Sequence, residues 1–306
     1  MIQIVLLTGF LGAGKTTLMQ RILDIYRENK IGVIINEFGQ INIDAKLVSH
    51  EGIEVAELSN GSIFCACIKD KFVDGLIDMS KRDIEYLFIE ASGLADPSNM
   101  GNIIDGIRKD TNNNYILKGA ICIVDGLNFV DMVDVLPALE RQVKHANAVI
   151  VNKMDLIEES QFKEITDKIA EINSSVNIYP AIHCDVDIKK TVENFEVNRV
   201  LSEDTTNTYE SRPTTFIVKA DETIEKEKLI KFIEAIAESS YRIKGFANTN
   251  EGTVEISAVI NNIIITPWVK DEKTEIVVIS SIGIKMLSMI TKASKDILEG
   301  RLYIGR

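Results

Sequence analysis

Short runs of consecutive hydrophobic residues recur in the first half of the chain, and they are typical of strands buried on both faces of a parallel sheet. These runs cover residues 2–7, 31–35, 86–89, 120–124 and 148–151. Between them, hydrophobic residues recur with the three-to-four-residue spacing of helices, at 18–26, 67–82, 127–145 and 158–172. Strands alternating with helices predict an α/β fold with a mostly parallel sheet flanked by helices.

The pattern changes near residue 192. Residues 192–212 are polar and acidic, lack a clear period and precede Pro213, so we expect a linker there. Further along, strands are predicted at 214–219, 254–260, 263–265 and 275–280, and helices at 223–240 and 282–298. The chain is therefore predicted to form a first domain of residues 1–191 and a smaller α+β domain of residues 213–306.

Composition narrows the class of protein. The chain has 306 residues, of which 45% are hydrophobic and 26% charged, an ordinary globular mixture. Its 34 Lys and Arg against 46 Asp and Glu give a net charge of −12, which disfavours nucleic acid and anionic membranes as partners. No apolar run reaches the length of a membrane-spanning helix, and no basic leader precedes residues 2–7. Four cysteines are too few for a disulfide framework in a chain of this length, so we expect a soluble, reduced, cytoplasmic protein.

The segment GFLGAGKTT at residues 9–17 fits the phosphate-binding pattern G-x-x-x-x-G-K-[ST] between a predicted strand and a predicted helix. Glycines let backbone N–H groups converge on phosphate oxygens at a helix N-terminus. In this pattern the lysine reaches the β- and γ-phosphates, and the hydroxyl after it ligates Mg²⁺. The predicted nucleotide-binding residues are Gly12, Ala13, Gly14, Lys15, Thr16 (also the magnesium ligand) and Thr17.

A second motif indicates which base is bound. The sequence Asn152-Lys153-Met154-Asp155 fits N-K-x-D at the end of a predicted strand. The Asp155 carboxylate can accept hydrogen bonds from N1–H and the exocyclic amino group of guanine, a pair of donors that adenine does not offer. Asn152 is expected to stabilise the loop, and the stem of Lys153 to lie across the base. GTP is therefore preferred over ATP.

Acidic residues follow the strands that lie between these motifs. Glu37 and Asp44 come after the second predicted strand, and Glu90 comes directly after the third. Carboxylates at the carboxyl ends of parallel strands face the ligand crevice, where they can hold Mg²⁺ or orient the attacking water. With Lys15 they are the candidate catalytic residues, and the Gly93 backbone is placed to approach the γ-phosphate. The alternative is that these acids are solvated loop residues, which fits Glu90 least well.

Taken in order, the segments GFLGAGKTT, NEFGQINID, ELSNG, EASGLADP and NKMD resemble the CobW-type GTPases, relatives of the urease and hydrogenase nickel-insertion GTPases. The resemblance covers residues 1–185 and extends more loosely into the second domain. It implies a P-loop G domain that binds GTP, GDP and Mg²⁺. It also implies that the protein assists delivery of a metal or metal cofactor to, or maturation of, a client metalloprotein, and a corrinoid cofactor with a corrinoid protein as client is one alternative. The sequence leaves open whether the protein forms a homodimer.

The chain departs from this family where C-x-C-C normally follows the Asn-Gly pair. Ser62, Ile63, Phe64 and Cys65 occupy those positions, and a further thiol is present at Cys67. Cys65 and Cys67 can supply two thiolates to Zn²⁺ or Co²⁺, whereas a closed tetrahedral site needs four ligands. Glu37 or a partner protein could complete the site. The alternative is a pair of partly buried thiols that bind no metal.

Two kinds of function fit these motifs. One is a slow GTP hydrolase whose nucleotide states control docking to the client. The other is a nucleotide-dependent regulatory module that hydrolyses little and carries no metal of its own. A P-loop kinase is disfavoured by the N-K-x-D motif.

Overall fold

The computed structural model describes residues 1–36, 54–58, 69–134, 136–195, 214–259, 262–269 and 272–305. The described residues divide into two compact units, one ending at Phe195 and one starting at Thr214. Among the described helices, none combines the length and the apolar composition that crossing a bilayer requires.

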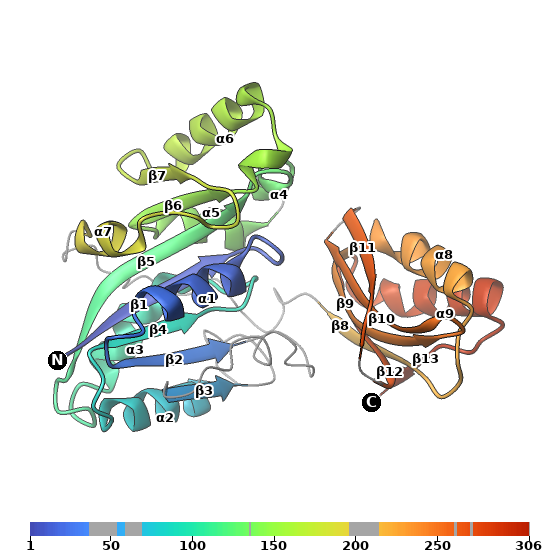
Figure 1. Cartoon of the computed structure of the whole chain (residues 1–306), viewed down its shortest axis with the longest axis horizontal. Helices are drawn as coiled ribbons and strands as arrows, with labels where there is room; N and C mark the ends of the chain where they lie inside the picture. Colours follow the sequence, from blue (N-terminus) through green and yellow to red (C-terminus); the bar gives the residue numbers. More distant parts are fainter. Residues whose placement is uncertain are drawn as a thin grey trace. The chain divides into compact units, whose positions relative to one another are not determined.

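The first unit is built on a parallel sheet with the strand order β3-β2-β4-β1-β5-β6-β7 (Figure 1). The strands are β1 (Ile2–Gly9), β2 (Ile31–Asn36), β3 (Glu54–Leu58), β4 (Tyr86–Glu90), β5 (Tyr115–Asp125), β6 (Ala148–Asn152) and β7 (Asn177–Pro180). Every strand predicted from an apolar run is present, and the predicted α/β class is confirmed. Strands β3 and β7 were not predicted.

Helices cover both faces of this sheet. They are α1 (Lys15–Ile25), α2 (Lys69–Ser80), α3 (Met100–Gly106), α4 (Phe129–Val133), α5 (Pro137–Lys144), α6 (Glu159–Ile172) and α7 (Ile188–Glu193). Helices α1 and α7 pack on one face, where Leu18 and Ile188 join a buried cluster with Val5 of β1. On the other face, Phe72 of α2 and Ile103 of α3 join the second buried cluster. Helix α5 packs against α4 and α6.

The sheet topology fixes where a ligand can bind. Strand β1 lies at the centre, with β4 on one side (Leu7 opposite Glu90) and β5 on the other (Thr8 opposite Cys122). The chain leaves β1 toward β2 on one side of the sheet and later reaches β5 on the other. A ligand crevice is expected outside the carboxyl ends of the strands at such a reversal. Because the GFLGAGKTT segment follows β1 directly, it lies at this point.

Two predicted boundaries in the first unit are wrong. The helix predicted for 127–145 is two helices, α4 and α5, and Pro137 is the first residue of α5. Proline lacks the N–H that a continuing helix would use, so the chain bends before it and restarts. Residues 192–195 were predicted to belong to the linker, but Val192 of α7 and Phe195 are buried in the core beside α1 and belong to the first unit.

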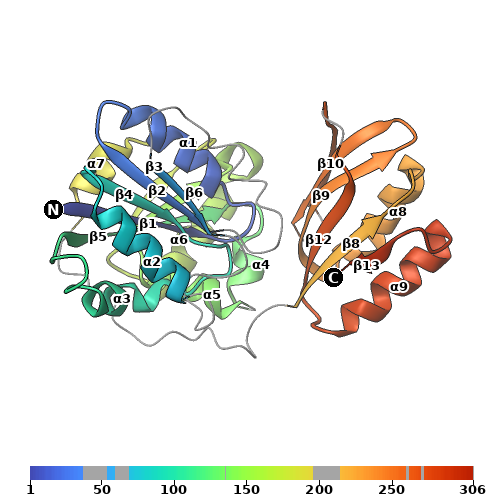
Figure 2. The ribbon, with the colours of Figure 1, turned by 90° about the horizontal axis from the view of Figure 1, so that it is seen from below.

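The second unit is a six-stranded antiparallel sheet with the order β11-β10-β9-β12-β8-β13. Helices α8 and α9 lie together on one face of it (Figure 2). Its elements are β8 (Thr215–Ala220), α8 (Lys226–Ala237), β9 (Ser240–Thr249), β10 (Gly252–Val259), β11 (Asn262–Pro267), β12 (Thr274–Ser280), α9 (Lys285–Leu298) and β13 (Tyr303–Gly305). The predicted second α+β domain is confirmed in class, but the inner strand β9 was not predicted.

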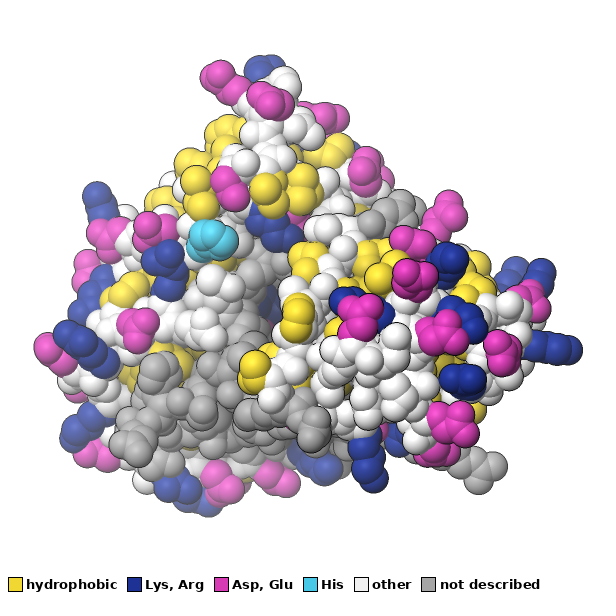
Figure 3. Space-filling model, turned by 45° about the vertical axis from the view of Figure 1, so that its right-hand side comes forward, with side chains coloured by type: hydrophobic (Ala, Val, Ile, Leu, Met, Phe, Trp, Pro, Cys, Tyr) yellow, Lys and Arg dark blue, Asp and Glu magenta, His cyan; other side chains and the backbone are white. Residues whose placement is uncertain are grey.

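The surface charge is mixed in sign. On the face that Figure 3 shows, Lys and Arg side chains of the described residues are interspersed with Asp and Glu. Among the described residues, several surface charges form ion pairs, such as Lys163–Asp167 and Lys226–Glu251. The net charge of −12 is therefore not gathered into one acidic area on this face.

Candidate functional site

The turn between β1 and α1 brings the phosphate-binding motif against the end of β6. Gly14 has φ +117°, a value that residues with a Cβ rarely adopt. A Cβ there would also lie 2.5 Å from Nδ2 of Asn152 and 3.0 Å from Sγ of Cys184. Glycine at this position lets the loop turn into α1 and lets the loops after β6 and β7 approach its backbone.

At the start of α1, the side chain of Lys15 contacts the phosphate loop and that of Thr16 contacts Glu90 of β4. The buried Lys15 ammonium donates hydrogen bonds to the carbonyl oxygens of Gly9 (3.0 Å) and Phe10 (3.1 Å), so the charge lies over the loop. The Thr16 hydroxyl lies 3.4 Å from Oε1 of Glu90, whose side chain is buried at the end of β4. A hydroxyl and a carboxylate are the oxygen donors that Mg²⁺ prefers, so this pair fits the predicted magnesium site.

Asn152 joins three loops of the site. Its side chain is buried, with Nδ2 donating to the carbonyl of Ala13 (2.9 Å) and Oδ1 accepting from the N–H of Cys184 (2.8 Å). The loop-stabilising role predicted for Asn152 thus has a physical basis: one amide links the phosphate loop, the end of β6 and the loop after β7.

Beyond Asn152 the N-K-x-D motif opens to solvent. Lys153 has φ +66°, and its ammonium pairs with Oδ2 of Asp125 at 2.8 Å. Asp155 lies in a short 3₁₀ turn (Met154–Leu156) and is exposed. The motif therefore combines an anchored Asn152 and Lys153 with an accessible carboxylate, the arrangement that binding the edge of a base requires.

The loop after β7 closes this end of the site. His183 and Cys184 both have positive φ, 49° and 57°. Arg21 of α1 holds the loop, since its guanidinium donates to the His183 carbonyl (2.7 Å) and to Asp185 (2.9 Å). The Cys184 thiol is buried against the carbonyl of Gly14, and this burial raises its pKa to about 12, an effect that Arg21 partly offsets. At neutral pH Cys184 is a protonated packing group.

The segment after β4 reaches the phosphate loop from the other side. Residues 91–98 are buried, and a Cβ on Gly93 would lie 2.6 Å from the backbone nitrogen of Leu11. Only a glycine permits this approach, so Gly93 lies beside the phosphate loop, and its approach to the γ-phosphate stays a prediction.

Asp125 is a buried acid of the site that sequence reasoning missed. It ends β5, and its carboxylate accepts from the backbone N–H of Leu127, the side chain of Asn128 and Lys153. The available signal was the same as for Glu90, an acid directly after an apolar run.

The predicted residues Glu37, Asp44, Cys65 and Cys67 lie outside the described residues. Within the described ranges, no group of three or more His, Cys, Asp and Glu residues could hold a metal ion.

Comparison with known families places the chain. Residues 3–180 match the family described as CobW/HypB/UreG, nucleotide-binding domain. The chain belongs to the CobW/HypB/UreG family. Residues 214–290 match the cobalamin synthesis protein cobW C-terminal domain, so both domains of this CobW-type protein have counterparts in known families.

Among curated relatives, the CobW-type chain is 34% identical over 194 residues to the zinc chaperone YjiA of Escherichia coli, an alignment that covers 61% of this chain and 59% of YjiA. It is 30% identical over 198 residues to the zinc chaperone CobW of a Sinorhizobium species, covering 55% of each. These alignments span less than two thirds of the relatives' own lengths. Among solved structures, Zn(II)-bound YjiA GTPase from Escherichia coli is 24% identical, with 97% of this chain and 98% of that chain covered and a TM-score of 0.47.

Proposed function

We propose that this protein binds GTP and GDP with Mg²⁺, hydrolyses GTP slowly, and uses its two nucleotide states to control delivery of a transition metal to a client metalloprotein. The observation that carries the proposal is the convergence of three motifs, the phosphate loop, Glu90 and Asn152, at the carboxyl ends of β1, β4 and β6. Membership of the family supports nucleotide binding. The relatives named zinc chaperones support metal delivery.

In this proposal the phosphates bind over residues 12–17, at the N-terminus of α1. Lys15 exchanges its carbonyl partners for the β- and γ-phosphate oxygens. Thr16 and Glu90 would hold Mg²⁺, which would neutralise phosphate charge. Hydrolysis breaks the bond from the γ-phosphorus to the bridging oxygen as water adds to that phosphorus. Glu90, with Glu37 and Asp44, orients the water. Slow turnover is expected because no arginine in these motifs is placed to stabilise the developing charge.

In this proposal the N-K-x-D motif at the end of β6 selects the base. Asn152 and Lys153 are anchored by Ala13, Cys184 and Asp125, which leaves the exposed Asp155 carboxylate to accept from guanine N1–H and the amino group. An adenine in this position leaves the carboxylate without its two donors.

The cargo is proposed to be Zn²⁺ or Co²⁺, held by Cys65 and Cys67 with further ligands from Glu37 or the client. A second candidate function, a regulatory module without metal, is favoured by one observation: Ser62 and Phe64 stand where the family carries thiols.

The first test is nucleotide binding and turnover by the full chain. Titration with a fluorescent GDP analogue, competed by GTP, GDP and ATP, should give strong competition by the guanine nucleotides alone. Phosphate release should be slow, and Lys15→Ala should abolish it. The same variant should weaken the binding of GTP more than the binding of GDP, because GDP lacks the γ-phosphate that Lys15 is proposed to contact. Equal competition by ATP would overturn the guanine assignment, and fast turnover without a partner would overturn the switch. Zn²⁺ binding that is independent of nucleotide would favour a passive metal site.

A further inference from the structure

Helix α5 contacts the Gly93 segment through two adjacent side chains. The Gln142 amide nitrogen donates to the carbonyl oxygens of Gly93 (3.3 Å) and Ala95 (2.8 Å). The Arg141 guanidinium lies 3.4 Å from the carboxylate of Asp96. One turn of α5 therefore holds the segment at three points, Gly93, Ala95 and Asp96.

The Gln142 contacts set the orientation of peptides. A carbonyl oxygen accepts and never donates, so only the NH₂ group of this amide can serve Gly93 and Ala95, and both of its hydrogens are used. Because both carbonyls are held toward α5, the Gly93–Leu94 and Ala95–Asp96 peptide planes have limited freedom to rotate. Gly93 in turn lies against the backbone of Leu11 in the phosphate loop. Helix α5 thus fixes the orientation of the Gly93 peptide, which lies beside the phosphate loop.

The Asp96 contact adds a charged anchor. Asp96 is fully buried, and its carboxylate also caps the 3₁₀ turn Pro97–Asn99 by accepting from the N–H of Ser98 (3.0 Å). A buried carboxylate is costly without an opposite charge, and Arg141, only 17% exposed, supplies one. The segment cannot move far from α5 without separating this pair.

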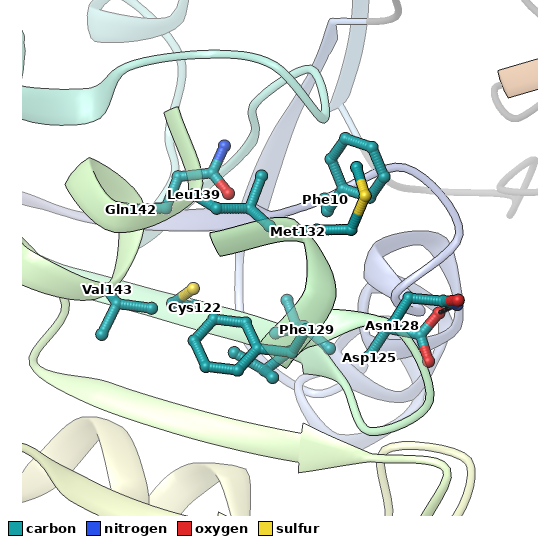
Figure 4. Close-up of a pocket in the computed structure, with 11 residues that line it drawn as sticks. Phe10, Cys122, Asp125, Asn128, Phe129, Met132, Leu139, Gln142 and Val143 are labelled. Carbon is teal, nitrogen blue, oxygen red and sulfur yellow. Dashed lines mark hydrogen bonds between the residues drawn. The ribbon is translucent and has the colours of Figure 1, made fainter. Parts of the chain in front are cut away.

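Packing alone does not account for Gln142. Its oxygen is buried and has no hydrogen-bond partner among the described residues, which is unfavourable for stability. The side chain borders a small, mainly apolar cavity between the phosphate loop, β5, α4 and α5, together with Phe10, Cys122 and Leu139 (Figure 4). An apolar side chain would fill this place without leaving a buried oxygen unpaired. The hydrogen bonds from the amide nitrogen to Gly93 and Ala95 explain why an amide occupies this position.

We infer that Gln142 and Arg141 are positioning residues for Gly93, and that α5 thereby tunes how the site distinguishes GTP from GDP. This inference rests on the proposed function, because it assigns Gly93 to the γ-phosphate. It adds that the contacts to α5 hold Gly93 in the orientation that meets the γ-phosphate, so that the state of the γ-phosphate and the position of α5 are coupled through these contacts. Loss of the contacts should affect GTP, which carries the γ-phosphate, and spare GDP.

The test compares variants of the full chain by GDP affinity, GTP affinity and single-turnover phosphate release. Gln142→Met keeps the length of the side chain and removes both donors. It should lower the hydrolysis rate and the GTP-to-GDP affinity ratio by about tenfold, the effect of removing two hydrogen bonds, while the GDP affinity stays within about twofold. Arg141→Met should act in the same direction, and Arg141→Lys should recover part of the loss by keeping a positive charge beside Asp96. Glu140→Gln, on the exposed side of α5, is the matched control and should match the parent.

The outcomes separate the inference from the proposed function. A parent protein that binds neither GTP nor GDP refutes the proposed function before any variant is made. A parent that binds both, with Gln142→Met unchanged in rate and ratio, refutes the positioning role alone. Equal loss of GTP and GDP affinity in Gln142→Met and in both Arg141 variants also refutes it, because that pattern indicates general damage to the domain. Should Gln142→Met fail to fold, the Arg141→Met and Arg141→Lys pair decides the inference.

Discussion

Asn152→Ala is expected to destabilise the first domain strongly. The side chain donates to Ala13 and accepts from Cys184, and both of these residues are fully buried. Truncation leaves a buried carbonyl and a buried N–H without partners, at a cost of about 1–3 kcal/mol each. The expected loss in the free energy of unfolding is therefore roughly 2–6 kcal/mol, a large fraction of the ~5–15 kcal/mol of a typical domain.

Urea denaturation can assign this loss to one domain. Circular dichroism reports on both domains, whereas the single tryptophan, Trp268, reports on the second domain, where its ring packs 4.9 Å from that of Phe246. The midpoint of the first-domain transition should fall by about 1 M or more. The Trp268 fluorescence transition should not move. Asn177→Ala, the same change at an exposed position of β7, should shift neither transition. A loss in Asn152→Ala no larger than in Asn177→Ala would show that the two hydrogen bonds add nothing to stability.

Three further predictions concern the base, the pH dependence and the metal. Asp155→Asn should move the preference from guanine toward xanthine nucleotides, measured by competition against a fluorescent GDP analogue; unchanged guanine selectivity would remove Asp155 from the base site. Because burial raises the pKa of Cys184 to about 12 from an ordinary value of about 9, the folded state keeps this proton while the unfolded state loses it. Stability should therefore be unaffected below about pH 9 and fall above it by about 1.4 kcal/mol per pH unit for this thiol. Cys184→Ser should show a shallower fall in urea titrations from pH 8 to 10.5, and equal slopes would contradict the shift. Cys65→Ser and Cys67→Ser should each weaken Zn²⁺ binding in competition with a chromogenic chelator, whereas unchanged binding in both would move the metal site elsewhere.

The sequence predicted those parts of the fold that have a strong local pattern. Strands such as β1 and β6 are buried on both faces, and they appear as runs that are almost wholly apolar. Strand β9 gave no such run, because Arg242 and Lys244 alternate with Ile243 and the glycine at 245 along it. This strand is placed by its pairing with β10 and β12, which a local pattern does not reveal.

The same division holds for the site. The phosphate loop and N-K-x-D are local motifs whose residue types follow from the chemistry of phosphate and guanine. The contact of Asn152 with Ala13 joins residues 139 positions apart, and that of Gln142 with Ala95 spans 47. Such contacts depend on how the strands are ordered in the sheet. Asp125 combines both cases, since its place after an apolar run was visible while its pairing with Lys153 was not.

The central place of β1 in the sheet has a consequence for synthesis of the protein. This strand leaves the ribosome before either of its neighbours in the sheet, and those neighbours are distant in sequence, with Leu7 opposite Glu90 and Thr8 opposite Cys122. At a synthesis rate of roughly 5–20 residues per second, several seconds pass before β4 is available and longer before β5 is. During this time an almost wholly apolar strand has neither neighbour. Until then β1 exposes apolar surface to aggregation, and substitutions that delay β4 or β5 should raise aggregation during synthesis even where the finished protein is stable.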